Sequence, residues 1–192
     1  EPHDVAAMSA WMQYNAQVKS KLAGLIAHYL LSLKEGGVAP KAMEIARSEK
    51  SKWDSALKKT SGDVTSFAEF TWPKIELSLK QGKYDQAEQF LLEMLWDYPG
   101  DEKTLRFLAQ LYLFKHEWRL ADIVYQVLQE QGLEDIEILN NRILLQVQIE
   151  GVEAGVKGLE ELETRYPNEA AIIQNRAMLA SHFDDRAHAL LL

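Results

Sequence analysis

The sequence predicts an all-α protein, built from stacked pairs of helices with a long helical hairpin in front of them. Two observations lead to this expectation. Helix-breaking residues are scarce, with 10 glycines and 5 prolines among 192 residues, while 47% of the residues are hydrophobic and recur at helical spacing. In the second half of the chain, residue types also recur at a constant step, from position 84 to 118 to 152, which is typical of helical repeats. We call this spacing the repeat step.

Composition excludes several classes of protein. The chain has no cysteine, which excludes disulfides, thiolate zinc sites and cysteine nucleophiles. Its net charge of −8 argues against nucleic acid as a partner. The longest apolar stretch, 22–33, is too short to cross a membrane, so no integral membrane segment is expected. No signal peptide is recognisable, and a soluble protein of the cytoplasm or the periplasm fits equally well.

Residues 1–62 are expected to form the N-terminal helical hairpin. A stripe of apolar residues runs from Val5 to Leu33 at steps of three and four, which predicts one long helix. The pair Gly36-Gly37 ends it, and Pro40 suits the first turn of a second helix. The hairpin could cap the helices that follow or serve as an arm for dimerisation or docking.

Residues 63–192 are expected to hold the repeats. Thr71 is expected to cap a helix with Pro73 in its first turn. Gly132 and Gly151 are expected at helix exits, where a positive φ is needed. The recurring positions, each one repeat step apart, are Tyr84, Trp118 and Val152, then Ala87, Ala121 and Gly155, and then Pro99, Leu133 and Pro167.

This spacing resembles the tetratricopeptide repeat family, over residues 68–192. In the frame of that family, the repeats would be 68–101, 102–135 and 136–169, with a partial fourth at 170–192. The second helix of every repeat matches the family pattern well. The first helix matches less closely, and its best match is in the repeat 102–135, at Leu105, Leu108, Ala109 and Tyr112. The resemblance implies a right-handed α-solenoid of 34-residue helix–turn–helix repeats. It also implies that the first helices line a concave face where protein partners bind.

No pattern in the chain indicates an enzyme. The phosphate-binding, dinucleotide, metalloprotease and nucleophile-elbow motifs are all missing from the sequence. The densest metal-like group is His182, Asp184, Asp185 and His188, but its two histidines are six residues apart and lie on different faces of a helix. We therefore expect no catalytic residue, no metal and no cofactor. A role as the regulatory domain of an enzyme stays open.

The resemblance also selects candidate residues for binding a protein or a peptide. Asparagine and glutamine recur one repeat step apart, at 140–141 and 174–175, and such amides can pair with an extended peptide backbone. The aromatic side chains would supply apolar pockets, and Lys103 and Arg106 could meet a carboxylate. The family's carboxylate-clamp residues are replaced at several positions, so an acidic C-terminal tail is not the expected ligand. The full set is Trp72, Glu76, Lys103, Arg106, Gln110, Phe114, Asn140, Asn141, Leu144, Gln174 and Asn175.

Three functions follow from these expectations. The first is a non-catalytic scaffold that binds a peptide or protein segment on the concave face. The second is a self-assembling structural component, joined through the hairpin or through the apolar segment 187–192. The third, by analogy with the family alone, is a specialised chaperone or assembly factor of a bacterial secretion, pilus or envelope system.

Overall fold

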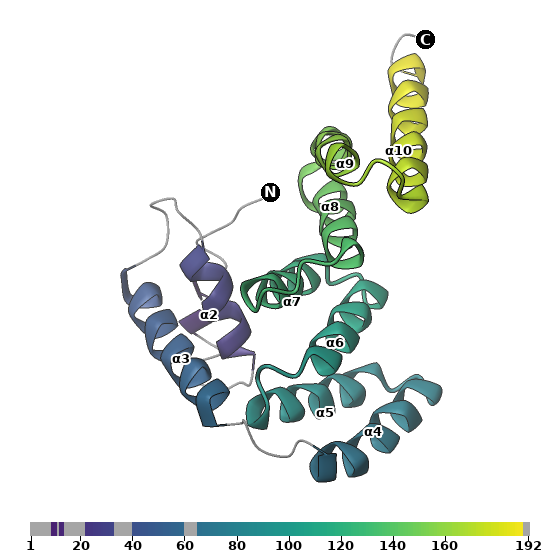
Figure 1. Cartoon of the computed structure of the whole chain (residues 1–192). Coiled ribbons are helices and arrows are strands. Elements are labelled where there is room, and N and C mark those ends of the chain that lie inside the picture. The colour runs from purple at the N-terminus through teal and green to yellow at the C-terminus, as the bar shows by residue number, and fades with distance from the viewer. Residues whose placement is uncertain (1–8, 11, 14–21, 33–39, 60–64, 190–192) are drawn as a thin grey trace. The chain divides into compact units, whose positions relative to one another are not determined.

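The computed structural model describes residues 9–10, 12–13, 22–32, 40–59 and 65–189. These residues form mostly helices, and no β-strand occurs among them, so the predicted all-α class is confirmed (Figure 1). None of the described helices is long and apolar enough to span a membrane. Most of the predicted first helix lies outside the described residues.

The described part of the N-terminal hairpin consists of helices α2 (Ala23–Ser32) and α3 (Pro40–Lys59), which pack against each other. Gly24 permits a close crossing, since a Cβ atom at this position would lie 2.6 Å from Cε3 of Trp53. Helix α2 also packs against α7 (Trp118–Glu130), and α3 packs against α5 (Tyr84–Asp97). The hairpin therefore lies along the second helices of the two pairs that follow. Its predicted end at residue 62 falls outside the described residues.

Two helical pairs follow the hairpin. Helix α4 (Thr65–Lys80) pairs with α5, and α6 (Glu102–Phe114) pairs with α7, while α5 packs against α6. Ala87 and Ala121 are fully buried, as expected for small residues where helices cross. The large side chains buried with them are Leu91, Met94, Leu105, Leu108, Tyr112 and Ile123.

The predicted helix start at Thr71 is wrong. Helix α4 begins at Thr65, so both Thr71 and Pro73 lie in the middle of the helix and not at its start. The side chain of Thr71 is also buried from solvent. Proline has no N–H for the carbonyl oxygen four residues earlier, which belongs to Glu69. Both Pro73 and Glu69 are exposed, so water can replace this hydrogen bond. Burial of Ile75 and packing of α4 against α5 offset the cost of the proline.

The remaining helices are α8 (Ile136–Glu150), α9 (Val152–Arg165) and α10 (Ala170–Ala189). Helix α9 packs against both α8 and α10. Residues up to Gln131 belong to one compact unit, the N-terminal unit, and residues from Gly132 onward belong to another, the C-terminal unit. The core of the C-terminal unit is built on Leu159, Leu162, Ile172 and Leu179.

Helix starts recur with the same step as the sequence pattern. Helices α5, α7 and α9 begin at residues 84, 118 and 152, and α6, α8 and α10 begin at residues 102, 136 and 170. The predicted positive φ is confirmed at Gly132 (+84°) and Gly151 (+106°). Gly82 has φ +69°, and His116, which lies one repeat step later, has φ +59°. The two turns thus use the same backbone geometry, although only one of them has a glycine.

Candidate partner-binding face

The predicted binding residues divide between the two compact units. Six belong to the N-terminal unit, where α4 and α6 carry them, and five belong to the C-terminal unit, on α8 and α10. The first group is Trp72, Glu76, Lys103, Arg106, Gln110 and Phe114, and the second is Asn140, Asn141, Leu144, Gln174 and Asn175.

Trp72 of the N-terminal group makes an aromatic contact between α4 and α6, with Phe107, which is not one of the eleven predicted residues. The ring centroids of Trp72 and Phe107 are 4.9 Å apart in an edge-to-face arrangement. Nζ of Lys103 lies 4.0 Å from the Trp72 ring centroid, which is a cation–π distance. Trp72 and Phe107 are half-buried and Lys103 is exposed. One side of this cluster is therefore open to a partner.

A second aromatic contact lies two turns further along α6. Phe114 is 61% exposed, and its ring centroid is 4.7 Å from that of Tyr84 at the start of α5. Phe107 and Phe114 are seven residues apart, which corresponds to roughly 10 Å along a helix. Three residues of an extended peptide span about the same distance. We call the surface formed by Trp72, Glu76, Lys103, Phe107, Gln110 and Phe114 the α4–α6 face.

The charged residues of this region have different surroundings. Glu76 and Gln110 are exposed and available to a partner. Lys103 has no carboxylate within ion-pair distance among the described residues. Arg106 is half-buried, and its Nε lies 2.8 Å from Oε1 of Glu102, one turn earlier on the same helix. The predicted contact of Arg106 with a partner's carboxylate would have to compete with this ion pair.

In the C-terminal unit, the structure brings two of the predicted amides together. Nδ2 of Asn175 on α10 donates a hydrogen bond of 3.1 Å to Oδ1 of Asn140 on α8. Asn140 is buried, so its oxygen is used inside the chain. Leu144 packs against the core cluster, and Gln174 is exposed. Asn140 and Asn175 therefore link α8 to α10, whereas Asn141 is half-buried on α8 and Gln174 faces solvent.

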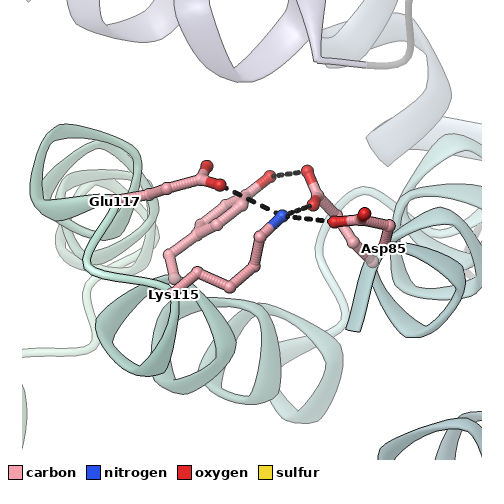
Figure 2. A network of polar contacts seen from close by, with 5 residues as sticks. Asp85, Lys115 and Glu117 are labelled. Atoms are coloured by element: carbon pink, nitrogen blue, oxygen red, sulfur yellow. Dashed lines mark hydrogen bonds and ion pairs between the residues drawn. The ribbon is translucent and has the colours of Figure 1, made fainter. Parts of the chain in front are cut away.

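A cluster of polar side chains, which sequence reasoning missed, joins three helices of the N-terminal unit. Nζ of Lys115, after the end of α6, lies 3.0 Å from Asp85, 2.5 Å from Glu88 and 3.0 Å from Glu117 (Figure 2). The hydroxyl group of Tyr112 donates a hydrogen bond of 3.0 Å to Glu88. Asp85 and Glu88 belong to α5, and Glu117 precedes α7. We call these five residues the Lys115 cluster.

The Lys115 cluster changes the pKa of two of its members. Burial raises the pKa of Tyr112 well above its usual value, and the nearby charge and hydrogen bond of Glu88 raise it further. Burial lowers the pKa of Lys115, but hydrogen bonds to Glu88, Asp85 and Glu117 outweigh this effect and raise it overall. Both groups therefore keep their protons to a higher pH in the folded protein than in the unfolded chain.

This difference predicts that the protein loses stability in alkaline solution. The unfolded chain releases the two protons near pH 10, while the folded protein still holds them, so the free energy of unfolding falls as the pH rises above about 10. The stabilisation is fully present below that pH. Denaturant titrations between pH 7 and pH 11 should show this fall, and it should be smaller in Lys115→Met and Tyr112→Phe. An unchanged pH dependence in both variants would contradict the assignment.

The described residues contain no group of three or more histidine, aspartate or glutamate side chains placed to hold a metal ion. The side chains of His182, Asp184, Asp185 and His188 lie outside the described part of the chain. No protein-family model, no curated protein and no solved structure matches the chain. The assignment of function therefore rests on the surfaces of the molecule itself.

Proposed function

We propose that this chain is a non-catalytic interaction module of the tetratricopeptide repeat type, a right-handed α-solenoid whose α4–α6 face binds an extended segment of a partner protein. The single observation that carries the proposal is the pair of aromatic contacts on this face, at Trp72 with Phe107 and at Tyr84 with Phe114. Aromatic side chains at half-exposed positions are typical anchors of protein interfaces.

The regular helix starts support the repeat assignment. The repeat step separates equivalent helices in both units, and Ala87, Ala121 and Gly155 are buried at equivalent positions of the second helices. Such pairs cannot bury their apolar surfaces alone, and stacking them makes a continuous core. The first helices α4 and α6 then carry the exposed side chains that a partner can reach.

The dimensions of the α4–α6 face support a peptide ligand. In a polyproline II segment, which has three residues per turn and rises about 3.1 Å per residue, two apolar side chains three residues apart lie on the same side and would reach the two aromatic contacts. Lys103 lies next to the first contact and can pair with an acidic side chain of the segment. The expected ligand is therefore an extended segment with apolar residues at positions i and i+3 and an acidic residue beside the first of them.

Selection from a random peptide library with the full chain tests this proposal. Bound peptides should share that pattern, and the double variant Trp72→Ala/Phe114→Ala should weaken their binding at least tenfold, because each anchor contributes more than about 1 kcal/mol. Affinity is measured by fluorescence anisotropy of labelled peptides. Far-UV circular dichroism verifies that the variant is folded.

Phe70→Ala provides a matched control. Phe70 is 74% exposed and lies on α4, but it is two residues before Trp72 and so points about 200° away around the helix axis. Its removal should leave peptide binding unchanged. Equal losses in Phe70→Ala and in the double variant, or no selected peptides at all, would contradict the assignment of the face.

The exposed flank of α4 favours self-assembly as a second candidate function. Phe70 and Leu77, which is 55% exposed, are seven residues apart and so share one side of the helix. Large apolar side chains that share an exposed surface often mark contacts between chains. Light scattering should then show dimers or larger species that Phe70→Ser/Leu77→Ser converts to monomers. A monomer at all concentrations would exclude this function.

A further inference from the structure

A pocket lies away from the α4–α6 face, between the N-terminal hairpin and α5. Its volume is about 250 Å³, and it is lined by Gly24, Glu49, Lys52, Trp53, Ala56, Leu95, Trp96 and Pro99. The two indole rings come from different helices, Trp53 from α3 and Trp96 from α5. Trp53 is almost fully buried, whereas Trp96 is 53% exposed and so reaches the rim of the pocket.

The size of the pocket indicates what can enter it. Pockets for drug-sized ligands have volumes of roughly 300–1,000 Å³. This pocket is smaller and suits a single long side chain. Most of its lining is apolar, from Ala56, Leu95, Pro99 and the two indoles, and such a lining suits an aliphatic stem.

The charges of the pocket indicate the end group of that side chain. The side chain of Glu49 is only 13% exposed, while its ion-pair partner Lys52 is 63% exposed and largely solvated. Because Lys52 donates to only one oxygen of the Glu49 carboxylate, an apolar side chain entering here would remove water from the other oxygen without replacing its hydrogen bonds, which is costly. A cation would instead pair with the carboxylate and be attracted by the indole rings.

We propose that this pocket binds an arginine side chain of a partner protein. The guanidinium group stacks on indole more often than the ammonium group of lysine does, and it can donate two hydrogen bonds to one carboxylate. In the bound state, the exposed Lys52 ammonium group gives way to solvent and the guanidinium donates to the Glu49 carboxylate in its place, while Trp96 stacks on the guanidinium and the apolar lining surrounds the methylene groups. The net charge of −8 also attracts a basic partner. This site is independent of the α4–α6 face and does not rest on the proposed function.

The indole N–H signals in the NMR spectrum of the ¹⁵N-labelled full chain provide the test. The probe is arginine capped as an amide at both ends, and the matched control is capped citrulline, which has the same shape without the charge. Capped arginine should shift the signals of Trp53 and Trp96 in a saturable manner, and citrulline should not. Trp96→Phe assigns the Trp96 signal. The Trp72 signal, on the α4–α6 face, is an internal control and should not move.

Two variants test the roles of the lining residues. Glu49→Gln should weaken binding of capped arginine about tenfold, because a hydrogen-bonded charge partner is lost. Trp96→Ala should weaken it about fivefold, because a stacking surface is lost. Since Trp96 is half exposed, its removal should leave the thermal melting temperature almost unchanged, which verifies folding.

Three results would overturn the proposal. Equal shifts with citrulline would show that the pocket takes neutral side chains. The absence of saturable shifts at millimolar arginine would show that it takes no basic group. Shifts confined to Trp72 would move the arginine site to the α4–α6 face. None of these results bears on whether selected peptides bind at the α4–α6 face, so the two proposals fail separately.

Discussion

Replacing Tyr112 by alanine is expected to lower the free energy of unfolding by about 4 kcal/mol. Tyr112 is fully buried on α6, so its removal leaves a cavity the size of an aromatic ring in the N-terminal unit. It also removes the hydroxyl group that donates to Glu88. Urea denaturation followed by circular dichroism measures the loss as a lower midpoint.

Tyr112→Phe separates the two contributions. Phenylalanine fills the same space but cannot donate to Glu88, so the loss should be about 2 kcal/mol, which is typical of a hydrogen bond to a charged group. Lys115 stays within reach of Glu88 and limits the cost. If Tyr112→Phe were as destabilising as Tyr112→Ala, the hydrogen bond and not the packing would dominate. A loss under about 1 kcal/mol in Tyr112→Ala would contradict the burial of the ring.

Replacing Gly155 by valine is expected to cost about 3 kcal/mol in the C-terminal unit. A Cβ atom on Gly155 would lie 2.1 Å from Cγ2 of Val147 on α8 and 3.3 Å from Cδ1 of Leu179 on α10. Helices α8 and α9 would have to move apart, although valine has a higher helix propensity than glycine. The midpoint of urea denaturation should fall accordingly.

Shortening the opposing side chain should restore part of the stability. The double variant Gly155→Ala/Val147→Ala lacks Cγ2 of Val147, which is the atom closest to the new Cβ at position 155. It should therefore be more stable than Gly155→Ala alone. Ala154→Val is the matched control, since it places valine at a half-exposed position of the same helix and should cost less than about 1 kcal/mol. Equal losses at positions 154 and 155 would show that helix propensity, and not the crossing, is responsible.

Much of the local structure could be predicted because it depends on neighbouring residues. The starts of α5, α7 and α9 follow the repeat step, and Gly132 and Gly151 have the predicted positive φ. Glycine is favoured there because it has no Cβ to clash. The same local reasoning failed at Thr71, where a suitable capping residue before Pro73 lies inside a longer helix. There, packing against α5 outweighs the local preference.

The candidate site was predictable only in part. The sequence pattern placed Trp72, Lys103 and Phe114 on the first helices of their pairs, and the structure brings Trp72 and Lys103 into contact. The sequence pattern did not indicate that Asn140 and Asn175 form a hydrogen bond with each other, or that Arg106 forms an ion pair with Glu102. A repeat pattern gives the position of a side chain on its helix, whereas its partner depends on rotamers and on the distance between helices.

The sequence by itself determined that the described part of this protein is helical, where the helices from α5 to α10 begin, and that Ala87, Ala121 and Gly155 are buried at equivalent positions, because these properties arise from backbone conformation and from apolar periodicity along the chain. Only the tertiary structure decided that Lys115 meets three carboxylates and that Trp53 and Trp96 line one pocket. These groups come from residues far apart in the sequence. Ion pairs and stacking contacts form only when the groups approach within a few ångströms, so these contacts exist only after α3, α5, α6 and α7 have packed together.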